Sequence, residues 1–394
     1  MSRRSRKIFG FGIFSVVLAY ALMRLFVAPM VDKSLNLQVP HRPYVISDAA
    51  AELHSGLRVM DWHTDTMLWD RDLLERSSYG HLDLPRMADG NIAVQMFTTV
   101  TKTPRGQNYD SNTGDSDNIT SLAVVQGWPV RTWSSLLERA LYQAERLDGF
   151  VTASEGKLVW IKSKGDLAAF TEGYTPSVWT GGARGVLLGS EGAHPLEGDL
   201  ANIDRMFDAG YRMIGLTHFF DNDVAGSLHG TSKAGLSDFG RQVVAQLDAR
   251  EIIIDLAHAS EQAAWETLSI TKRPVVVSHT GFKGACNSAR NVSDDLMKAI
   301  ADKGGLIAVG FWQGAVCGDT PDAIADAIEY GIGLVGADHV ALGSDWDGTT
   351  HSITAEDLPA ITDMLLQRGV PEEAIRKVMG ENSLRFLGKW LPAT

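Results

Sequence analysis

The stretch that most constrains the fold of this chain covers residues 251–290. It holds two nearly continuous apolar runs, 252–256 and 274–277, and each run is followed by a histidine, His258 and His279. Such runs are typical of strands buried on both faces of a parallel sheet, where functional groups gather at the carboxyl ends of the strands. One histidine in this position is most often a core residue. Two on consecutive strands favour a functional site at that edge of the sheet.

Eight apolar runs of this kind alternate with amphipathic segments along the chain. The predicted strands cover residues 57–62, 92–100, 185–189, 212–217, 252–256, 274–278, 306–311 and 340–344. The helical patterns cover 133–147, 203–209, 238–248, 261–268, 296–302 and 323–328, with a further helix expected within 371–391. This alternation predicts an α/β fold, a (β/α)8 TIM-like barrel, which needs about 250 residues and carries its active site at the C-terminal ends of the strands. Residues 101–127, rich in Gly, Asn, Asp and Ser, are expected to form a long loop over the barrel mouth.

Ionisable side chains stand at the ends of six of the predicted strands. They are His63 and Asp65 after the first strand, Glu191 after the third, His218 after the fourth, His258 after the fifth, His279 after the sixth, and Asp345 with Asp347 after the eighth. A barrel brings such side chains around a single pocket. Buried carboxylates without partners are costly, and a divalent metal ion supplies the missing partner.

These ligand types and their number indicate two metal ions. Imidazole and carboxylate together suit zinc, although manganese, iron or cobalt would also accept them. A catalytic zinc takes about three protein ligands, and this chain offers at least five. His63 and Asp65 could hold one ion, His258 and His279 the other, with Glu191 as a bridge. Such a pair, roughly 3.5–4 Å apart, polarises a carbonyl and lowers the pKa of a shared water toward neutrality, which is hydrolase chemistry.

The first 33 residues differ from the rest of the chain. An apolar run over residues 8–23 resumes over 25–31 after one arginine, and four basic residues precede it: Arg3, Arg4, Arg6 and Lys7. This pattern predicts an N-terminal transmembrane anchor, with a cleaved signal peptide as the alternative. Because positive flanks stay inside, the bulk of the chain is expected outside the cytoplasm, in the periplasm or the extracellular space. Residues 34–43 then form a linker, and residues 44–394 the barrel domain.

Charge and cysteine content limit the partners and the covalent links. Removing the six Lys/Arg and the one Asp of residues 1–33 leaves 30 basic and 47 acidic side chains, about −17, so nucleic acid is not an expected partner. The chain has two cysteines, Cys286 and Cys317. In an exported domain they could form one disulfide, and the alternative is two buried free thiols.

Seven short motifs, in one order along the chain, resemble the membrane dipeptidases, also called the renal dipeptidase family. The motifs are DWHTDT at 61–66, GSEG at 189–192, LTHFFDN at 216–222, IDLAHAS at 254–260, VVSHTG at 276–281, ARNVSD at 289–294 and GSDWDG at 343–348. The resemblance runs from about Tyr44 to the C-terminus. It implies a zinc metallopeptidase that hydrolyses dipeptides, including those with a C-terminal D-residue, by a hydroxide that bridges two zinc ions. Members of the family often form homodimers, so a homodimer is expected.

The resemblance also implies roles for single residues. The implied zinc ligands are His63, Asp65, Glu191, His258 and His279, with Glu191 shared by both ions. His218 is implied to contact the substrate and to stabilise charge on the scissile carbonyl oxygen, Arg290 to pair with the substrate carboxylate, and Asp345 to contact the substrate and move the proton. Cys286 and Cys317 are implied to form a disulfide. An arginine clamps a terminal carboxylate bidentately, and a fixed distance from clamp to metal selects short substrates.

Two alternatives stand beside a dipeptidase. Another barrel metallohydrolase would act on N-acyl amino acids, lactones or phosphoesters, but such enzymes usually carry His-x-His on the first strand and a bridging lysine. This chain has His63-x-Asp65, and no lysine ends its third or fourth predicted strand. A non-catalytic peptide-binding domain would be expected to have lost at least one ligand. The complete set, together with Arg290 and Asp345, favours an enzyme.

Overall fold

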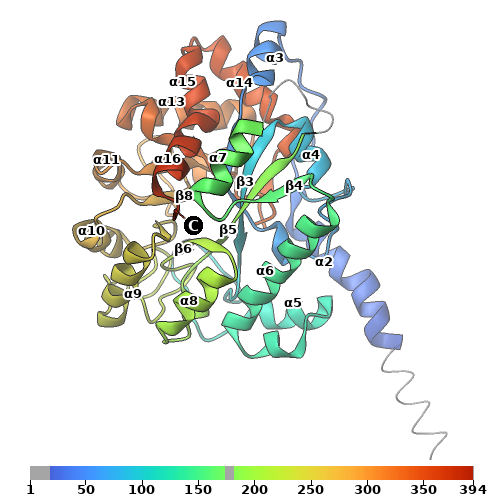
Figure 1. Ribbon diagram of the computed structural model, residues 1–394, viewed down its shortest axis with the longest axis vertical. Helices are drawn as coiled ribbons and strands as arrows, with labels where there is room; N and C mark the ends of the chain where they lie inside the picture. The colour runs from blue at the N-terminus through green and yellow to red at the C-terminus, as the bar shows by residue number, and fades with distance from the viewer. Residues whose placement is uncertain (1–17, 174–181, 394) are drawn as a thin grey trace, which may run out of the picture.

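Eight parallel strands form a closed barrel, and helices surround it (Figure 1). The computed structural model describes residues 18–173 and 182–393, and these statements concern that part of the chain. The barrel strands are β2 (Val59–Thr64), β3 (Ile92–Thr99), β5 (Arg184–Ser190), β6 (Tyr211–Gly215), β7 (Ile253–Asp255), β8 (Val276–Thr280), β9 (Leu306–Val309) and β10 (Val340–Leu342). They neighbour one another in the order β3-β2-β10-β9-β8-β7-β6-β5, and pairing of β3 with β5 closes the ring. The predicted barrel is confirmed.

The barrel strands are buried on both sides, which explains their continuous apolar sequences. Every residue of β2, β3 and β5 is buried, and the same holds for the shorter strands. Along β2 the side chains alternate in direction. Trp62 packs edge-on against Phe386 of a C-terminal helix and donates a hydrogen bond to Ser383 Oγ (2.8 Å), so the next residue, His63, points to the other side.

The helices that cover the barrel begin where the sequence offers good caps. They are α3 (Asp48–Ser55), α4 (Leu84–Asp89), α6 (Leu136–Ala153), α7 (Lys164–Gly173), α8 (Ala201–Asp208), α9 (Asp238–Ala249), α10 (Glu261–Ile270), α11 (Asp294–Asp302), α12 (Gln313–Val316), α13 (Pro321–Val335) and α14 (Leu358–Gln367). Three consecutive ones, α9, α10 and α11, follow Ser237, Ser260 and Ser293, whose side chains accept hydrogen bonds from backbone N–H groups at the helix start. Serine is among the preferred residues at this position.

Several elements were not among the strands and helices expected from the sequence, and two of them lie close to the barrel mouth or to its wall. A short strand, β4 (Leu158–Trp160), pairs in parallel with the first half of β5 outside the ring. Inside the predicted loop 101–127, residues Asn118–Gln126 form the helix α5. The Asp117 side chain caps α5 by accepting from Ile119 N (2.9 Å), and Gly127 ends it in the left-handed conformation (φ 74°). The loop over the mouth is therefore shorter than predicted.

The single helix expected within residues 371–391 is interrupted. Helix α15 (Glu372–Arg376) and helix α16 (Asn382–Trp390) are separated by the irregular helical turn Lys377–Glu381. At Gly380 the backbone passes so close to the barrel that a Cβ atom would lie 1.9 Å from the Arg58 carbonyl oxygen. The break therefore lets this C-terminal segment pack against the start of β2.

The N-terminal segment packs beside the barrel mouth. Residues 18–35 are helical, ending in α2 (Ala28–Leu35), and this helix leaves the body of the molecule near α5 and α6 (Figure 1). The next residues form β1 (Leu37–Gln38), which pairs in parallel with β11 (His351–Ser352). Part of the predicted linker is thus bound to the barrel.

No helix in the described ranges combines the length and the apolar character that crossing a membrane requires. Residues 8–17 of the apolar run 8–31 lie outside the described residues, and the predicted anchor stays a prediction.

Cys286 and Cys317 form a disulfide, as the family resemblance implied. The bond joins the loop after β8 to the residue that follows α12. It excludes the alternative of two free thiols. It also ties together two segments that carry residues of the site described next, Arg290 and Trp312.

Candidate metal centre

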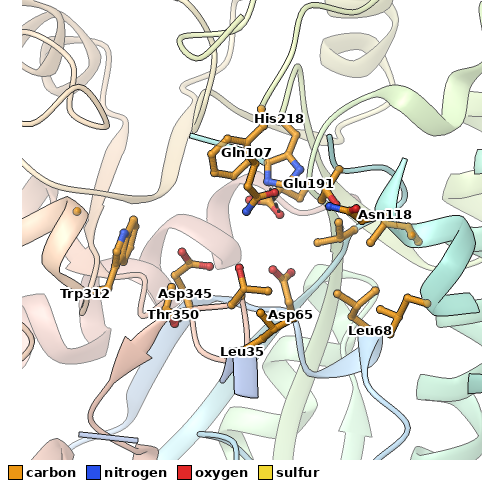
Figure 2. A pocket seen from close by; sticks show the side chains of 18 of the residues that line it. Leu35, Asp65, Leu68, Gln107, Asn118, Glu191, His218, Trp312, Asp345 and Thr350 are labelled. Carbon is orange, nitrogen blue, oxygen red and sulfur yellow. Dashed lines mark hydrogen bonds and ion pairs between the residues drawn. The ribbon is translucent and has the colours of Figure 1, made fainter. Parts of the chain in front are cut away.

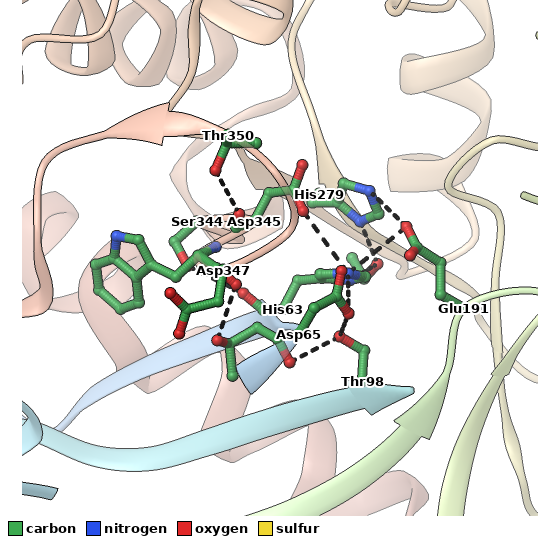
Figure 3. Close-up of polar contacts among 12 residues, drawn as sticks. His63, Asp65, Thr98, Glu191, His279, Ser344, Asp345, Asp347 and Thr350 are labelled. Carbon is green, nitrogen blue, oxygen red and sulfur yellow. Dashed lines mark hydrogen bonds and ion pairs between the residues drawn. The ribbon is translucent and has the colours of Figure 1, made fainter. Parts of the chain in front are cut away.

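A cluster of buried ionisable side chains lies at the carboxyl ends of the barrel strands (Figure 3). Its members are His63, Asp65, Glu191, His218, His258, His279 and Asp345, each between 0% and 8% exposed. The structure brings all seven together from six strand ends. The pocket predicted from the strand-end residues therefore exists.

Glu191 lies at the centre of the cluster. Its Oε1 atom lies 3.1 Å from His258 Nε2, 3.3 Å from His279 Nε2 and 3.6 Å from His63 Nε2. Its other oxygen, Oε2, lies 3.3 Å from His218 Nε2. One carboxylate thus faces four imidazoles, the arrangement expected of a ligand shared between two ions.

His63 and Asp65 project to the same side because they are two residues apart at the end of β2. His63 Nε2 lies 3.5 Å from Asp65 Oδ1 and 4.0 Å from Asp345 Oδ1. Thr98 Oγ1 donates to Asp65 Oδ1 (2.8 Å) and fixes that carboxylate. Three overlapping groups could each hold a cation: His63–Glu191–His279, Glu191–His218–His258 and His63–Asp65–Asp345.

Ser278 and Asp255 orient two of the histidines from behind. Ser278 Oγ donates to Asp255 Oδ2 (2.6 Å), and it lies 2.9 Å from His279 Nδ1 and 3.2 Å from His63 Nδ1. A ring nitrogen that donates to such an outer partner leaves the other nitrogen free for a metal ion. Within the described residues, His63 Nε2 is buried and has no hydrogen-bond partner.

The charges of the cluster fit a divalent cation. Burial and the nearby Asp65 raise the pKa of Glu191 well above its usual value. Burial alone would lower the pKa of His63, but the Glu191 and Asp65 carboxylates raise it to about 10. Burial, together with the positive charge of Arg290, lowers the pKa of His258. The raised pKa values of His63 and Glu191 therefore favour protons that offset the negative charge of the carboxylates, and a divalent cation would supply that positive charge instead.

Asp345 is held at the cavity by a strained loop. Its backbone is left-handed (φ 60°), and its side chain leans over Gly348, where a Cβ atom would lie 2.0 Å from Asp345 Oδ1. The preceding Ser344 is fixed because its N–H and Oγ donate to the Asp61 carboxylate (2.7 and 2.9 Å). Burial and the Asp65 charge raise the pKa of Asp345 to about 8. The other loop carboxylate, Asp347, is fully buried and pairs with Arg71 (2.8 Å).

Arg290 places a buried positive charge beside the histidines. Its Nη2 donates to the His279 carbonyl oxygen (2.8 Å) and lies 3.3 Å from His258 Nε2. The guanidinium lies 5.4 Å from the ring centroid of Trp312, whose Nε1 donates to Tyr109 Oη (2.8 Å). A cationic end of the site is thereby framed by aromatic rings.

A cavity of about 900 Å³ opens over this cluster (Figure 2). Asp65, Glu191, His218, His258, Arg290 and Asp345 line it. So do Trp312 and Tyr109, which the sequence analysis did not single out. Trp312 directly follows the seventh predicted strand, so including aromatic residues at the strand ends would have identified it. Tyr109 comes from the irregular loop before α5, which carries no periodic signal.

The family model described as membrane dipeptidase (peptidase family M19) matches residues 47–390. This chain belongs to the membrane dipeptidase family. It is a metallopeptidase, and the family together with the metal-binding residue groups supports metal-dependent hydrolysis of dipeptides.

Individual relatives agree with this assignment. The chain is 28% identical over 354 residues to Dipeptidase aclJ of Aspergillus oryzae, covering 83% of this chain and 77% of that protein. Its fold is similar to a metallo peptidase from Rhodobacter sphaeroides bound to a phosphinate mimic of L-Ala-D-Ala (21% identity, TM-score 0.71, 85% and 99% covered). It is also similar to the probable dipeptidase PvdM from Pseudomonas aeruginosa (20% identity, TM-score 0.70, 87% and 98% covered). At such identities the two structures support the barrel fold.

Proposed function

We propose that this membrane dipeptidase hydrolyses dipeptides with free ends, including those with a C-terminal D-residue, with two zinc ions per chain. One observation carries the proposal: the buried Arg290 guanidinium lies 3.3 Å from His258 in the histidine and carboxylate cluster. If Arg290 binds the terminal carboxylate of a substrate, the distance from that carboxylate to the metal ligands is therefore short. That span suits a single residue after the scissile bond.

The donor set would divide between two zinc ions. His63 and Asp65 would hold one ion and His258 and His279 the other, with Glu191 shared, in agreement with the central place of its carboxylate. Bound zinc would polarise the scissile carbonyl and lower the pKa of water.

The remaining steps belong to side chains of the protein. Asp345 Oδ1 takes the proton from the attacking water and delivers it to the leaving amine, since a raised pKa suits a carboxylate for carrying a proton near neutral pH. His218 stays neutral because burial lowers its pKa, and it donates a hydrogen bond to the oxygen on which charge develops. Arg290 holds the substrate carboxylate in a bidentate clamp.

We also propose that the catalytic domain faces the periplasm or the extracellular space on an uncleaved N-terminal anchor. The basic flank and apolar run of residues 3–31 support the anchor. The Cys286–Cys317 disulfide supports an oxidising compartment. Protease added to cells whose outer membrane has been opened while the plasma membrane stays intact is expected to digest the barrel domain, and a barrel domain that stays protected until the plasma membrane is lysed would contradict this placement. A homodimer remains expected from the family.

The experiment that tests the activity is hydrolysis of a substrate panel by the full chain in lipid nanodiscs. The panel holds L-Ala-L-Ala, L-Ala-D-Ala, N-acetyl-L-Ala and L-Ala-L-Ala amide. Both free dipeptides are expected to be cleaved, chelator to abolish cleavage, and zinc to restore it. The amide is expected to react more than tenfold more slowly, because it lacks the charge that Arg290 binds. Failure of zinc-loaded, folded protein to cleave either dipeptide, or faster cleavage of N-acetyl-L-Ala, would overturn the proposal.

A further inference from the structure

The cavity extends beyond the cluster of ionisable side chains, and one of its sides is apolar. Its volume of about 900 Å³ lies near the top of the range of roughly 300–1,000 Å³ that is usual for small-molecule sites. Figure 2 shows Trp312 on one side of the pocket and Leu68 with Asn118 on the other, with Asp65, Asp345 and Glu191 between them. The Arg290 guanidinium lies 5.4 Å from the Trp312 ring centroid, so a dipeptide whose carboxylate is bound by Arg290 would point its first residue toward Leu68.

This second side is built largely from two helices. Its apolar lining residues are Val31 and Leu35 of α2, Leu68 after β2, and Ile119, Leu122 and Val125 of α5. Leu68 and Ile119 are buried (3% exposed each) in one hydrophobic cluster, and Val31 and Leu122 pack against it. The wall is therefore continuous from the barrel to the N-terminal helix.

The N-terminal helix is fixed in this position by buried polar contacts. Asp32, which follows Val31, is 2% exposed and pairs with Arg71 Nε (2.9 Å). Asn36 follows Leu35, donates to Asp32 Oδ1 (2.8 Å) and accepts from the backbone N–H of Thr349 (2.9 Å). Each wall residue of α2 thus has a neighbour anchored in the barrel.

We propose that α2 and α5 form an apolar subsite for the side chain of the amino-terminal residue of the substrate. The inference rests on the proposed function. It makes the helix next to the predicted anchor a part of the substrate site, and it specifies the substrate class as dipeptides with a large apolar first residue. A methylene group in a hydrophobic pocket changes kcat/KM by about 10- to 200-fold. L-Leu-L-Ala is therefore expected to exceed Gly-L-Ala in kcat/KM by more than tenfold.

The test compares these two dipeptides on the full chain in nanodiscs and on three single variants. Leu35→Ser and Leu122→Ser alter the wall from α2 and from α5. Met30→Ser is the matched control, since Met30 lies on α2, is 63% exposed and does not line the cavity. Both wall variants are expected to lower the kcat/KM ratio of L-Leu-L-Ala to Gly-L-Ala at least about fivefold, mainly through KM. The control is expected to keep the wild-type ratio.

The outcomes separate this inference from the function on which it rests. Cleavage of both dipeptides at equal kcat/KM, or wall variants with the ratio of the control, would overturn the subsite and leave the dipeptidase assignment intact. Cleavage of neither dipeptide would overturn the proposed function. A further substrate, N-decanoyl-L-alanine, places a long apolar chain on the same side of the amide. Faster cleavage of this compound than of L-Leu-L-Ala would overturn the dipeptide class in favour of N-acyl amino acids.

Discussion

Ser278 shows how single residues outside the ligand set shape this site. It lies between the Nδ1 atoms of His63 and His279 and donates its own hydrogen bond to Asp255. Both imidazoles therefore have a fixed orientation in which Nε2 faces Glu191. The chain is thus prearranged to bind metal before any substrate arrives.

Loss of this serine is expected to weaken metal binding. In Ser278→Ala, two ring nitrogens lose their acceptor, and zinc affinity is expected to fall about 10- to 100-fold, as is usual for outer-shell changes. Competition with a fluorescent chelator measures this. Ser269→Ala is the control, because Ser269 is exposed and only donates to the Glu266 carbonyl oxygen. Equal zinc affinity in the two variants would show that Ser278 does not orient the ligands.

Asp345 is the second residue whose role can be isolated. Asp345→Asn keeps the shape of the side chain and removes its ability to accept a proton. With zinc content unchanged, kcat for L-Ala-L-Ala is expected to fall about 10²- to 10⁴-fold, the usual contribution of a general acid or base. Hydrolysis at the wild-type rate would refute its role in proton transfer.

Among the elements, the N-terminal segment has the most consequences for the site. Arg71 joins the N-terminal segment to the loop after β10. The Arg71 guanidinium pairs with Asp32 through Nε and with Asp347 through Nη2. Asp347 also accepts from Thr66 Oγ1 (2.7 Å), and it belongs to the loop that carries Asp345. One buried arginine thus connects α2, the end of β2 and the catalytic loop.

Removing this arginine is expected to be costly. Arg71→Leu leaves two buried carboxylates without their cation, and breaking a buried ion pair in this way destabilises by about 3–5 kcal/mol. Arg76→Leu is the matched control, because Arg76 is 42% exposed at its side chain and its pairs with Asp89 and Glu356 lie at the surface, where such pairs are worth about 0–1 kcal/mol. Urea unfolding measures both. Similar losses in the two variants would contradict the account of this contact.

For the whole molecule, most of the barrel could be predicted because its strands are buried on both faces. The eight apolar runs mark the eight strands, and their ends supplied all seven ionisable groups of the cluster. Strand β4 was not predicted, because a strand of three residues is too short to show a sequence pattern. The packing of α2 on the barrel was not predicted, because an apolar run before a polar stretch has the same sequence pattern whether it enters a membrane or packs on α5. The place of Tyr109 in the cavity was not predicted, because an irregular loop carries no sequence pattern that indicates where its side chains will lie.

The fold as a whole contains buried neutral histidines that make it sensitive to acid. His54 on α3 lies between Thr362 Oγ1 (2.7 Å) and the Gly90 carbonyl oxygen (3.2 Å), and burial lowers its pKa to about 4. Since the unfolded chain binds this proton near pH 6.5, the stability from neutral His54 is present above that pH and is lost as pH falls toward 4. The loss amounts to about 3 kcal/mol.

The variant His54→Gln isolates this contribution, because glutamine keeps a donor and an acceptor and does not titrate. Between pH 6.5 and pH 4 the wild-type protein is expected to lose about 3 kcal/mol more unfolding free energy than the variant. Urea unfolding at several pH values measures the difference, in which the other titrating groups cancel. Parallel curves for the two proteins would mean that His54 is not held neutral.

The most direct measurement of the central claim is a titration of metal-free full-length protein with zinc, followed by the rate of L-Ala-L-Ala hydrolysis. If the ring around Glu191 is a two-ion dipeptidase centre, the rate starts near zero and rises to a plateau at two zinc ions per chain. A plateau at one ion would contradict the shared role of Glu191. Full activity of the metal-free protein would contradict the metal-dependent mechanism itself.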